Sequence, residues 1–218
     1  MKDAVLGVRW LVFLFGLWVM TVGIGVSVKS GLGTSPISTV PAVLVNVVPL
    51  SFGVITVLMN WILVVLQILM LGKRFTTINY LQFLIAIVFG TLCDASLMML
   101  DFLNPTTYLQ QWILVIIGAA LVALGVFIEV MPRLVYVPGE GVVAALSLRS
   151  GWRFGTVKQC VDWSLVISAA ILSLVFLGCL EGAREGTVFA AFAVGGLVKL
   201  YRRIWDDVLA KRAGKTVA

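Results

Sequence analysis

Three ionisable residues stand in or beside long apolar stretches of this 218-residue chain: Glu140, Lys158 and Asp162. Glu140 lies in the run Pro138-Gly139-Glu140-Gly141, where proline and glycine favour a break in regular structure. Lys158 and Asp162 are four residues apart, so a helix would place them on one face, where they can pair. A charge inside a membrane is costly unless it is paired or hydrated, so such residues are candidate sites for ions or solutes. The set carries one net negative charge and could hold a cation, or an anion once a carboxylate is protonated.

Each of the three residues also has a purely structural interpretation. Lys158 could extend its ammonium to the cytoplasmic interface, with its apolar stem against lipid. Asp162 could be no more than the ion-pair partner of that lysine. Glu140 could cap the start of its own helix as a carboxylate in the first turn, a role compatible with binding. These alternatives stay open at the level of the sequence.

The composition places these residues in a membrane protein. Hydrophobic residues make up 61% of the chain and charged residues 12%, with a mean hydropathy of +1.11. A soluble domain cannot bury so much apolar surface. Six windows approach the roughly 20 residues that a helix needs to cross a bilayer: 8–28, 52–71, 79–100, 111–131, 156–177 and 186–203. We therefore expect an all-α membrane protein with six transmembrane helices, the first a retained span rather than a signal peptide.

The distribution of basic residues predicts the orientation. The net charge is +6, but most of the positive charge lies in segments that share one side if the N-terminus is cytoplasmic. Lys29 and Arg184 are the exceptions. We expect both termini to be cytoplasmic, the basic tail 204–218 to lie near anionic lipid, and no nucleic acid to be bound.

The sequence offers little for metal or enzymatic chemistry. It has no histidine, and its three cysteines, Cys93, Cys160 and Cys179, form no CxxC pair. These absences disfavour zinc, haem and a disulfide framework. No phosphate-binding loop and no nucleophile–base arrangement is evident. We therefore expect no cofactor, no metal and no enzymatic activity.

The chain contains an internal repeat. Aligning it with itself at an offset of 102 residues pairs several uncommon residues: Trp10 with Trp112, Gly16 with Gly118, Gly23 with Gly125, Pro36 with Pro138, Phe52-Gly53 with Phe154-Gly155, and Trp61 with Trp163. Further on, the offset shortens to 96 and aligns Gly90-Thr91 with Gly186-Thr187. Each repeat, 8–103 and 110–203, holds three spans. Because three is odd, the second repeat must insert upside down, as in many secondary transporters.

A broken segment is predicted after the first span of each repeat. Residues 29–51 and 133–152 begin with glycine- and proline-rich backbone and continue as apolar stretches too short to span. Helices are expected to start at Pro36 and Pro138, because proline suits the first turn of a helix. Re-entrant half-helices would bring two helix N-termini, each with partial positive charge, to a common point. Helices lying on each membrane surface are the alternative.

The repeat also aligns the polar residues. Ser38, Thr56 and Asn60 occupy the positions of Glu140, Lys158 and Asp162. The candidate binding site therefore has a charged half in the second repeat and a neutral half in the first. The neutral half comprises Gly33, Thr34, Ser35, Ser38, Thr56 and Asn60, and Gly139 and Gly141 flank the glutamate. Candidates of second rank are Asp94, Thr91 and Glu129, the last expected at the membrane interface.

Four segments in order carry a resemblance to a known family: GLGTSP at 31–36, PGEG at 138–141, FGTVK at 154–158 and EGAREGT at 181–187. With them the chain resembles the bacterial YczE/YitT-type integral membrane proteins, and more closely the YczE-like branch. The resemblance implies a multi-pass protein of the bacterial inner membrane. It implies no substrate, and we expect no counterpart of the extra cytosolic domain of YitT-type members.

The function we expect is the movement of a small polar or charged solute across the bilayer, by secondary transport coupled to H⁺ or Na⁺. A passive channel is one alternative. A membrane partner or assembly factor that transports nothing is another. A second copy of the chain is a further candidate partner.

Overall fold

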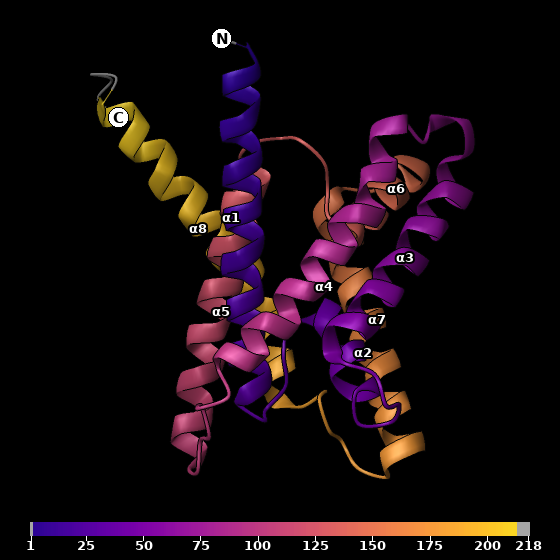
Figure 1. The fold of residues 1–218 in the computed structure, drawn as a ribbon, viewed down its shortest axis with the longest axis vertical. Helices are drawn as coiled ribbons and strands as arrows, with labels where there is room; N and C mark the ends of the chain where they lie inside the picture. The colour runs from indigo at the N-terminus through magenta and orange to yellow at the C-terminus, as the bar shows by residue number, and fades with distance from the viewer. Residues whose placement is uncertain (1, 213–218) are drawn as a thin grey trace.

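The computed structural model describes residues 2–212, and this part of the chain is helical without strands (Figure 1). The long helices are α1 (Lys2–Lys29), α3 (Phe52–Leu71), α4 (Leu81–Met99), α5 (Tyr108–Val130), α7 (Phe154–Leu177) and α8 (Glu185–Arg212). Two shorter helices, α2 (Pro36–Leu44) and α6 (Pro138–Ser150), follow α1 and α5. The 3₁₀ turns η1 (Gly72–Arg74) and η2 (Thr77–Tyr80) join α3 to α4.

Five helices are long and apolar enough to cross a membrane: Leu6–Lys29, Phe52–Arg74, Thr77–Met99, Tyr108–Val130 and Phe154–Leu177. They coincide with the first five predicted windows to within a few residues at each end. The sixth window forms the first part of α8, which is not among the five and carries Lys199, Arg202 and Arg203 along its middle. The expected tail is also partly helical, because α8 continues to Arg212. Residues 213–218 lie outside the described part of the chain.

Local sequence explains where the helices begin. Pro36 and Pro138 occupy the first turns of α2 and α6, as predicted. The Ser51 hydroxyl accepts a hydrogen bond from the Val54 amide and caps α3. Thr107 forms a reciprocal capping box with Gln110 at the start of α5.

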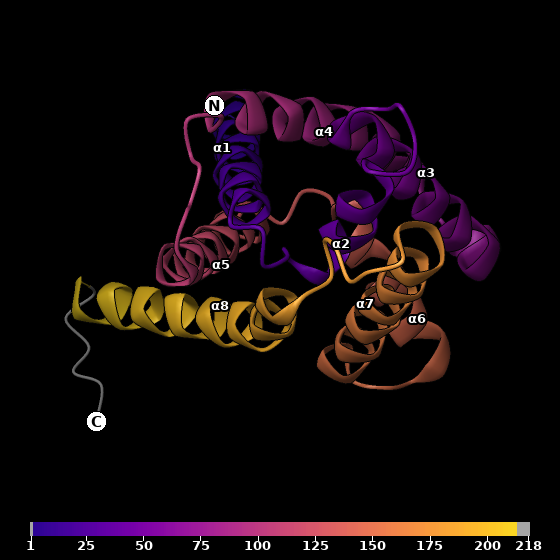
Figure 2. The same cartoon turned by 90° about the horizontal axis from the view of Figure 1, so that it is seen from below.

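The helix α1 packs along α5, and glycines make this approach close. Gly16 lies against the backbone of Glu129, and Gly125 lies against the backbone of Met20. Gly23 lies against Val122 in the same way. Figure 2 shows α5 between α1 and α8, with α4 on the other side of α1. Small residues allow such backbone contact in membrane helices.

The short helices cross between the two halves of the chain. The helix α2 packs mainly on α7, and α6 packs mainly on α3. Their N-terminal turns meet, because the Ile37 side chain lies against Gly139. Both helices are largely buried by their neighbours.

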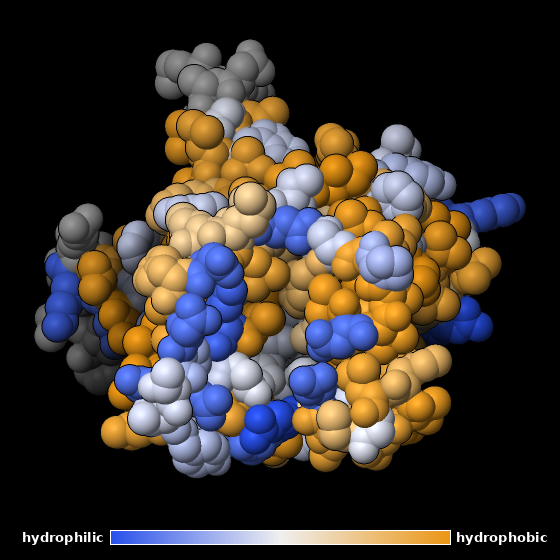
Figure 3. All heavy atoms as spheres, turned by 60° about the horizontal axis from the view of Figure 1, so that its bottom comes forward, coloured by the Kyte–Doolittle hydropathy of each residue, from blue (hydrophilic) through white to orange (hydrophobic). Residues whose placement is uncertain are grey.

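The surface is apolar to a degree that suits lipid. Leu11, Leu69 and Val175 are each about 70% exposed. Figure 3 shows hydrophobic residues over much of one face, with hydrophilic residues gathered in patches. The buried core centres on α1, where Phe13 and Leu17 are fully enclosed. These features agree with a multi-pass membrane protein.

Candidate functional site

The structure brings the three charged candidates together. The Lys158 ammonium donates a hydrogen bond to Asp162 Oδ1 at 2.5 Å, so the predicted pairing on one face of α7 is present. The Asp162 side chain is 14% exposed and that of Lys158 is 36% exposed. Glu140, in the first turn of α6, is half-buried and lies within electrostatic range of both residues. The start of α6 thus faces the beginning of α7.

Glu129, near the end of α5, is a fourth member of this group, and its position at the membrane interface stays a prediction. Its side chain is only 2% exposed, and it lies within electrostatic range of Glu140 and near the Val137 amide. One of its carboxylate oxygens, Oε2, has no hydrogen-bond partner. The close contact between its backbone and Gly16 encloses this end of α5. We call Glu129, Glu140, Lys158 and Asp162 the charged cluster.

The repeat relates Glu129 to a second buried polar residue. At the offset of 102 residues, Glu129 aligns with Ser27, which is also buried. Ser27 lies against Gly118 as Glu129 lies against Gly16. The two equivalent positions are therefore both buried beside a glycine, and only the structure shows this burial.

The charged cluster has an excess of negative groups. Three carboxylates share one ammonium, and burial makes an unpaired carboxylate costly. Binding a cation or a proton would relieve this cost. Among the side chains of residues 6–211, no group of three or more cysteines, aspartates or glutamates is arranged to hold a metal ion.

The neutral candidates at the start of α2 form a separate buried group. The Ser35 and Ser38 hydroxyls lie 3.2 Å apart, within hydrogen-bonding distance. The Thr34 amide donates to Thr187 Oγ1 on α8 at 3.2 Å. The Thr34 hydroxyl itself is buried without a partner, beside the tight turn at Gly33. This group therefore retains unused hydrogen-bonding capacity.

Thr56 and Asn60 are buried on α3 and do not contact the ion pair on α7 through hydrogen bonds. The Thr56 hydroxyl donates to the Phe52 carbonyl of its own helix at 2.8 Å. Asn60 is 3% exposed. In the described chain, no hydrogen bond joins these two residues to Lys158 or Asp162.

The glycines that flank Glu140 permit close packing. Gly139 lies against Ile37 of α2, and Gly141 lies against the Gln67 side chain of α3. A β-carbon at either position would collide with these neighbours. The two glycines thus allow α6 to begin between α2 and α3.

Two glutamines that the sequence analysis did not select hold this junction. Gln67 of α3 and Gln82 of α4 exchange amide hydrogen bonds at 2.9 and 3.1 Å. Gln67 Nε2 also donates to the Pro138 carbonyl at 3.1 Å. Both side chains are almost fully buried. The sequence signal for them is a glutamine inside each of two apolar windows, 52–71 and 79–100. The sequence does not indicate that the two side chains meet.

The second-rank candidates Asp94 and Thr91 make local structural contacts. The Asp94 carboxylate accepts hydrogen bonds from the Gly53 amide at 2.6 Å and from the Ser51 hydroxyl at 2.5 Å. It therefore satisfies the N-terminus of α3. Thr91 is exposed and donates to the Val88 carbonyl of its own helix.

Comparison with known proteins gives one match. Residues 7–203 match a family described as a family of unknown function, DUF6198. No curated protein matches the chain. No solved structure matches it either. Since the match covers nearly the whole of this all-helical, apolar chain, the protein belongs to the DUF6198 family.

Proposed function

We propose that this protein is a secondary transporter for a small polar or charged solute, with the charged cluster as its binding site. One observation carries the proposal: three carboxylates and one lysine gather where the short helix α6 begins, in a protein built from apolar helices. Ionisable groups at such a place are expensive and typically serve solutes, ions or protons. Protonation of a carboxylate, or binding of Na⁺, would couple the solute to an ion gradient.

The proposal includes an inverted repeat, which the contacts between α1 and α5 support. Gly16 contacts Glu129, and the equivalent residues Gly118 and Ser27 also contact each other. A two-fold relation requires such reciprocity, because a contact between residue i and residue j must recur with the two repeats exchanged. A second pair of contacts follows the same relation: Gly23 contacts Val122, and the equivalent residues Gly125 and Met20 contact each other.

The short helices fit the same symmetry. The packing of α2 on α7 corresponds to that of α6 on α3. Ile37 and Gly139, which touch, are themselves equivalent residues, so they would lie on the pseudo-two-fold axis. Buried half-helices whose N-termini meet at an axis are the arrangement of many transporter sites. Their burial favours broken or re-entrant segments over surface helices.

A difference between the repeats suggests the transport step. Gly53 of α3 lies against Gly90 and Asp94 of α4, whereas a β-carbon on its α7 equivalent, Gly155, would meet no atom of another element within 4 Å. We infer that the α3–α4 end is closed in this state and that the α7–α8 end is open. If the α3–α4 end then opened while the α7–α8 end closed, the site would be exposed to each side of the membrane in turn.

The resemblance to YczE-like proteins supports a bacterial inner-membrane location but supplies no substrate. The experiment is a thermal-shift screen of small solutes, together with flux measurements in proteoliposomes, on the wild type and Glu140→Gln. Glu181→Gln, which neutralises an exposed carboxylate, is the control. A solute should stabilise the wild type and the control, and Glu140→Gln should lose this shift and saturable, gradient-dependent flux.

The rivals predict other results. Flux that does not saturate and ignores ion gradients would indicate a channel. Unchanged binding and flux after neutralising Glu129, Glu140 and Asp162, with a co-purifying membrane protein, would indicate a partner or assembly factor. Either result would overturn the transporter.

A further inference from the structure

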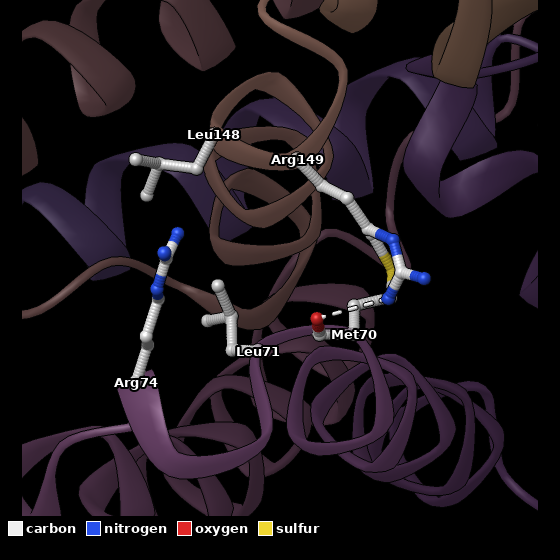
Figure 4. Close-up of a pocket in the computed structure, with 5 residues that line it drawn as sticks. All are labelled: Met70, Leu71, Arg74, Leu148 and Arg149. Atoms are coloured by element: carbon white, nitrogen blue, oxygen red, sulfur yellow. Dashed lines mark hydrogen bonds between the residues drawn. The ribbon is translucent and has the colours of Figure 1, made fainter.

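A hollow of about 220 Å³ opens between the end of α3 and the end of α6, remote from the first turn of α6 that carries Glu140 (Figure 4). Its lining consists of Met70, Leu71, Arg74, Leu148 and Arg149. Arg74 ends the span Phe52–Arg74, so the hollow lies at the edge of the apolar part of the molecule. It combines an apolar wall with two guanidinium groups from different elements.

The two arginines differ in their contacts. Arg149 Nη1 donates to the Met70 carbonyl at 3.2 Å, which fixes it over the exposed end of α3. Figure 4 shows Arg74 extended toward Leu148 on the other side of the hollow. The C-terminal dipoles of α3 and α6 favour cations and account in part for Arg149. They do not account for the direction of Arg74, whose side chain makes no hydrogen bond to residues 6–211, the part of the chain whose side chains the structure describes.

Within the described side chains, the positive charge of this hollow lacks a counter-ion. Among the described residues, the ion pairs involve Lys29, Lys158 and Arg184, and neither arginine of the hollow. Lys73 and Arg153 are adjacent in sequence to its lining elements and add positive charge. No acidic residue occurs in 66–80 or in 146–156. The two guanidinium groups would therefore attract an anion from both walls, against the weaker partial negative charge of the helix ends.

We propose that this hollow is a phosphate-binding site. The planar fork of a guanidinium pairs with two oxygens of a phosphate, and two arginines can hold one group from both sides. Met70, Leu71 and Leu148 would contact the apolar part of the same ligand. The ligand is a phosphate monoester or diester, carried either by an anionic lipid of the adjoining leaflet or by a soluble molecule. This proposal stands independently of transport.

The test uses the full-length protein in phosphatidylcholine nanodiscs with or without phosphatidylglycerol. Native mass spectrometry counts the phosphatidylglycerol that the protein retains, and thermal shift with inorganic phosphate tests a soluble source. Arg74→Gln should weaken the binding of the phosphate-bearing ligand about tenfold or more, since a charge-assisted pair is lost. Lys73→Gln is the matched control: it removes the same charge one residue away, from a side chain that does not line the hollow.

The outcomes separate the two sources. Retention of phosphatidylglycerol that depends on Arg74 but not on Lys73 would support a lipid ligand. A phosphate shift with the same dependence, without retained lipid, would support a soluble ligand. No binding in either arm, or equal losses in both variants, would overturn the proposal. Thermal unfolding of Arg74→Gln in phosphatidylcholine alone checks that this variant is folded. Arg149→Gln also loses the hydrogen bond to Met70, so its binding is compared with that of Arg74→Gln and is not used alone.

Discussion

At the scale of single residues, the surroundings decide what each carboxylate does. Both carboxylate oxygens of Asp94 accept hydrogen bonds from residues at the start of α3. Glu129 is buried and leaves one oxygen without a partner. The first arrangement stabilises a helix end, and the second leaves capacity for a ligand. Residue type alone does not distinguish the two.

Asp94→Asn should destabilise the protein without removing ligand binding. The substitution removes a negative charge from a helix N-terminus and weakens two hydrogen bonds, at a cost of about 1 kcal/mol. Thermal unfolding in detergent measures the loss. Asp206→Asn on the exposed part of α8 is the control and should have little effect. If the two variants unfold alike, the role of Asp94 as a cap is wrong; if Asp94→Asn loses the solute response, Asp94 belongs to the site.

The ion pair between Lys29 and Asp101 gives a pH-dependent contribution to stability. Lys29 Nζ donates to Asp101 Oδ1 at 2.6 Å, and this bond lowers the pKa of the exposed Asp101 carboxyl. Because the folded pKa lies below the unfolded value of about 3.9, the stabilisation is complete above that value and is lost as the pH falls through the folded pKa. The effect should be small, since the carboxylate is exposed.

Asp101→Asn should therefore lower the Tm slightly at neutral pH and converge with the wild type in acid. Thermal unfolding from neutral to acid pH measures this difference. Lys29→Gln should give the same loss, and the double variant should add nothing to it. A difference between wild type and Asp101→Asn that persists in acid would contradict the ion pair as its cause.

At the scale of elements, the contact between α1 and α5 depends on backbone approach at glycine. A β-carbon at Gly125 would meet the backbone of Met20, which cannot move aside as a flexible side chain can. Gly195 on α8 has open space beside it. Alanine substitutions at these two glycines therefore separate the effect of close packing from the effect of helix propensity.

Gly125→Ala should destabilise the protein, and Gly195→Ala should not. Overpacking costs about 1–3 kcal/mol, whereas alanine in place of glycine favours a helix by about 1 kcal/mol. Chemical or thermal unfolding of the two variants should thus give changes of opposite sign. Equal behaviour would show that α1 and α5 do not approach as described.

At the scale of the whole molecule, the described chain begins and ends at the same side. The start of α1 and the end of α8 lie at one end in Figure 1, and the connection from α4 to α5 lies at the other. The basic residues of η1 lie at the end that holds the chain ends. By the positive-inside rule we expect that end to be cytoplasmic.

Lys73→Cys and Asn104→Cys, on either side of α4, should label from opposite faces of the membrane. The exposed Cys160 and Cys179 are first replaced by serine, while the buried Cys93 stays. A membrane-impermeant maleimide should label Asn104→Cys in right-side-out vesicles and Lys73→Cys in inverted vesicles. The reverse pattern would overturn the orientation, and labelling of both from one face would exclude α4 as a span.

The sequence by itself determined the features that depend on neighbouring residues. The starts of α2 and α6 at Pro36 and Pro138, and the pairing of Lys158 with Asp162, need only a few consecutive positions. The first five apolar windows likewise record which solvent each segment prefers. The sequence did not predict where α8 ends. Hydropathy marks only the edge of the membrane, whereas lysine and arginine are good helix formers and continue the helix beyond it.

Only the tertiary structure decided which polar residues are enclosed, and by what. Glu129 is buried because Gly16 admits the backbone of α5, and Gln67 reaches Pro138 from a helix far away in the sequence. The glutamate of the PGEG run gained its neighbours in the same way, from α5 and α7. Local pattern sets a residue's helix and its face, but the burial of a charge depends on which backbones approach it.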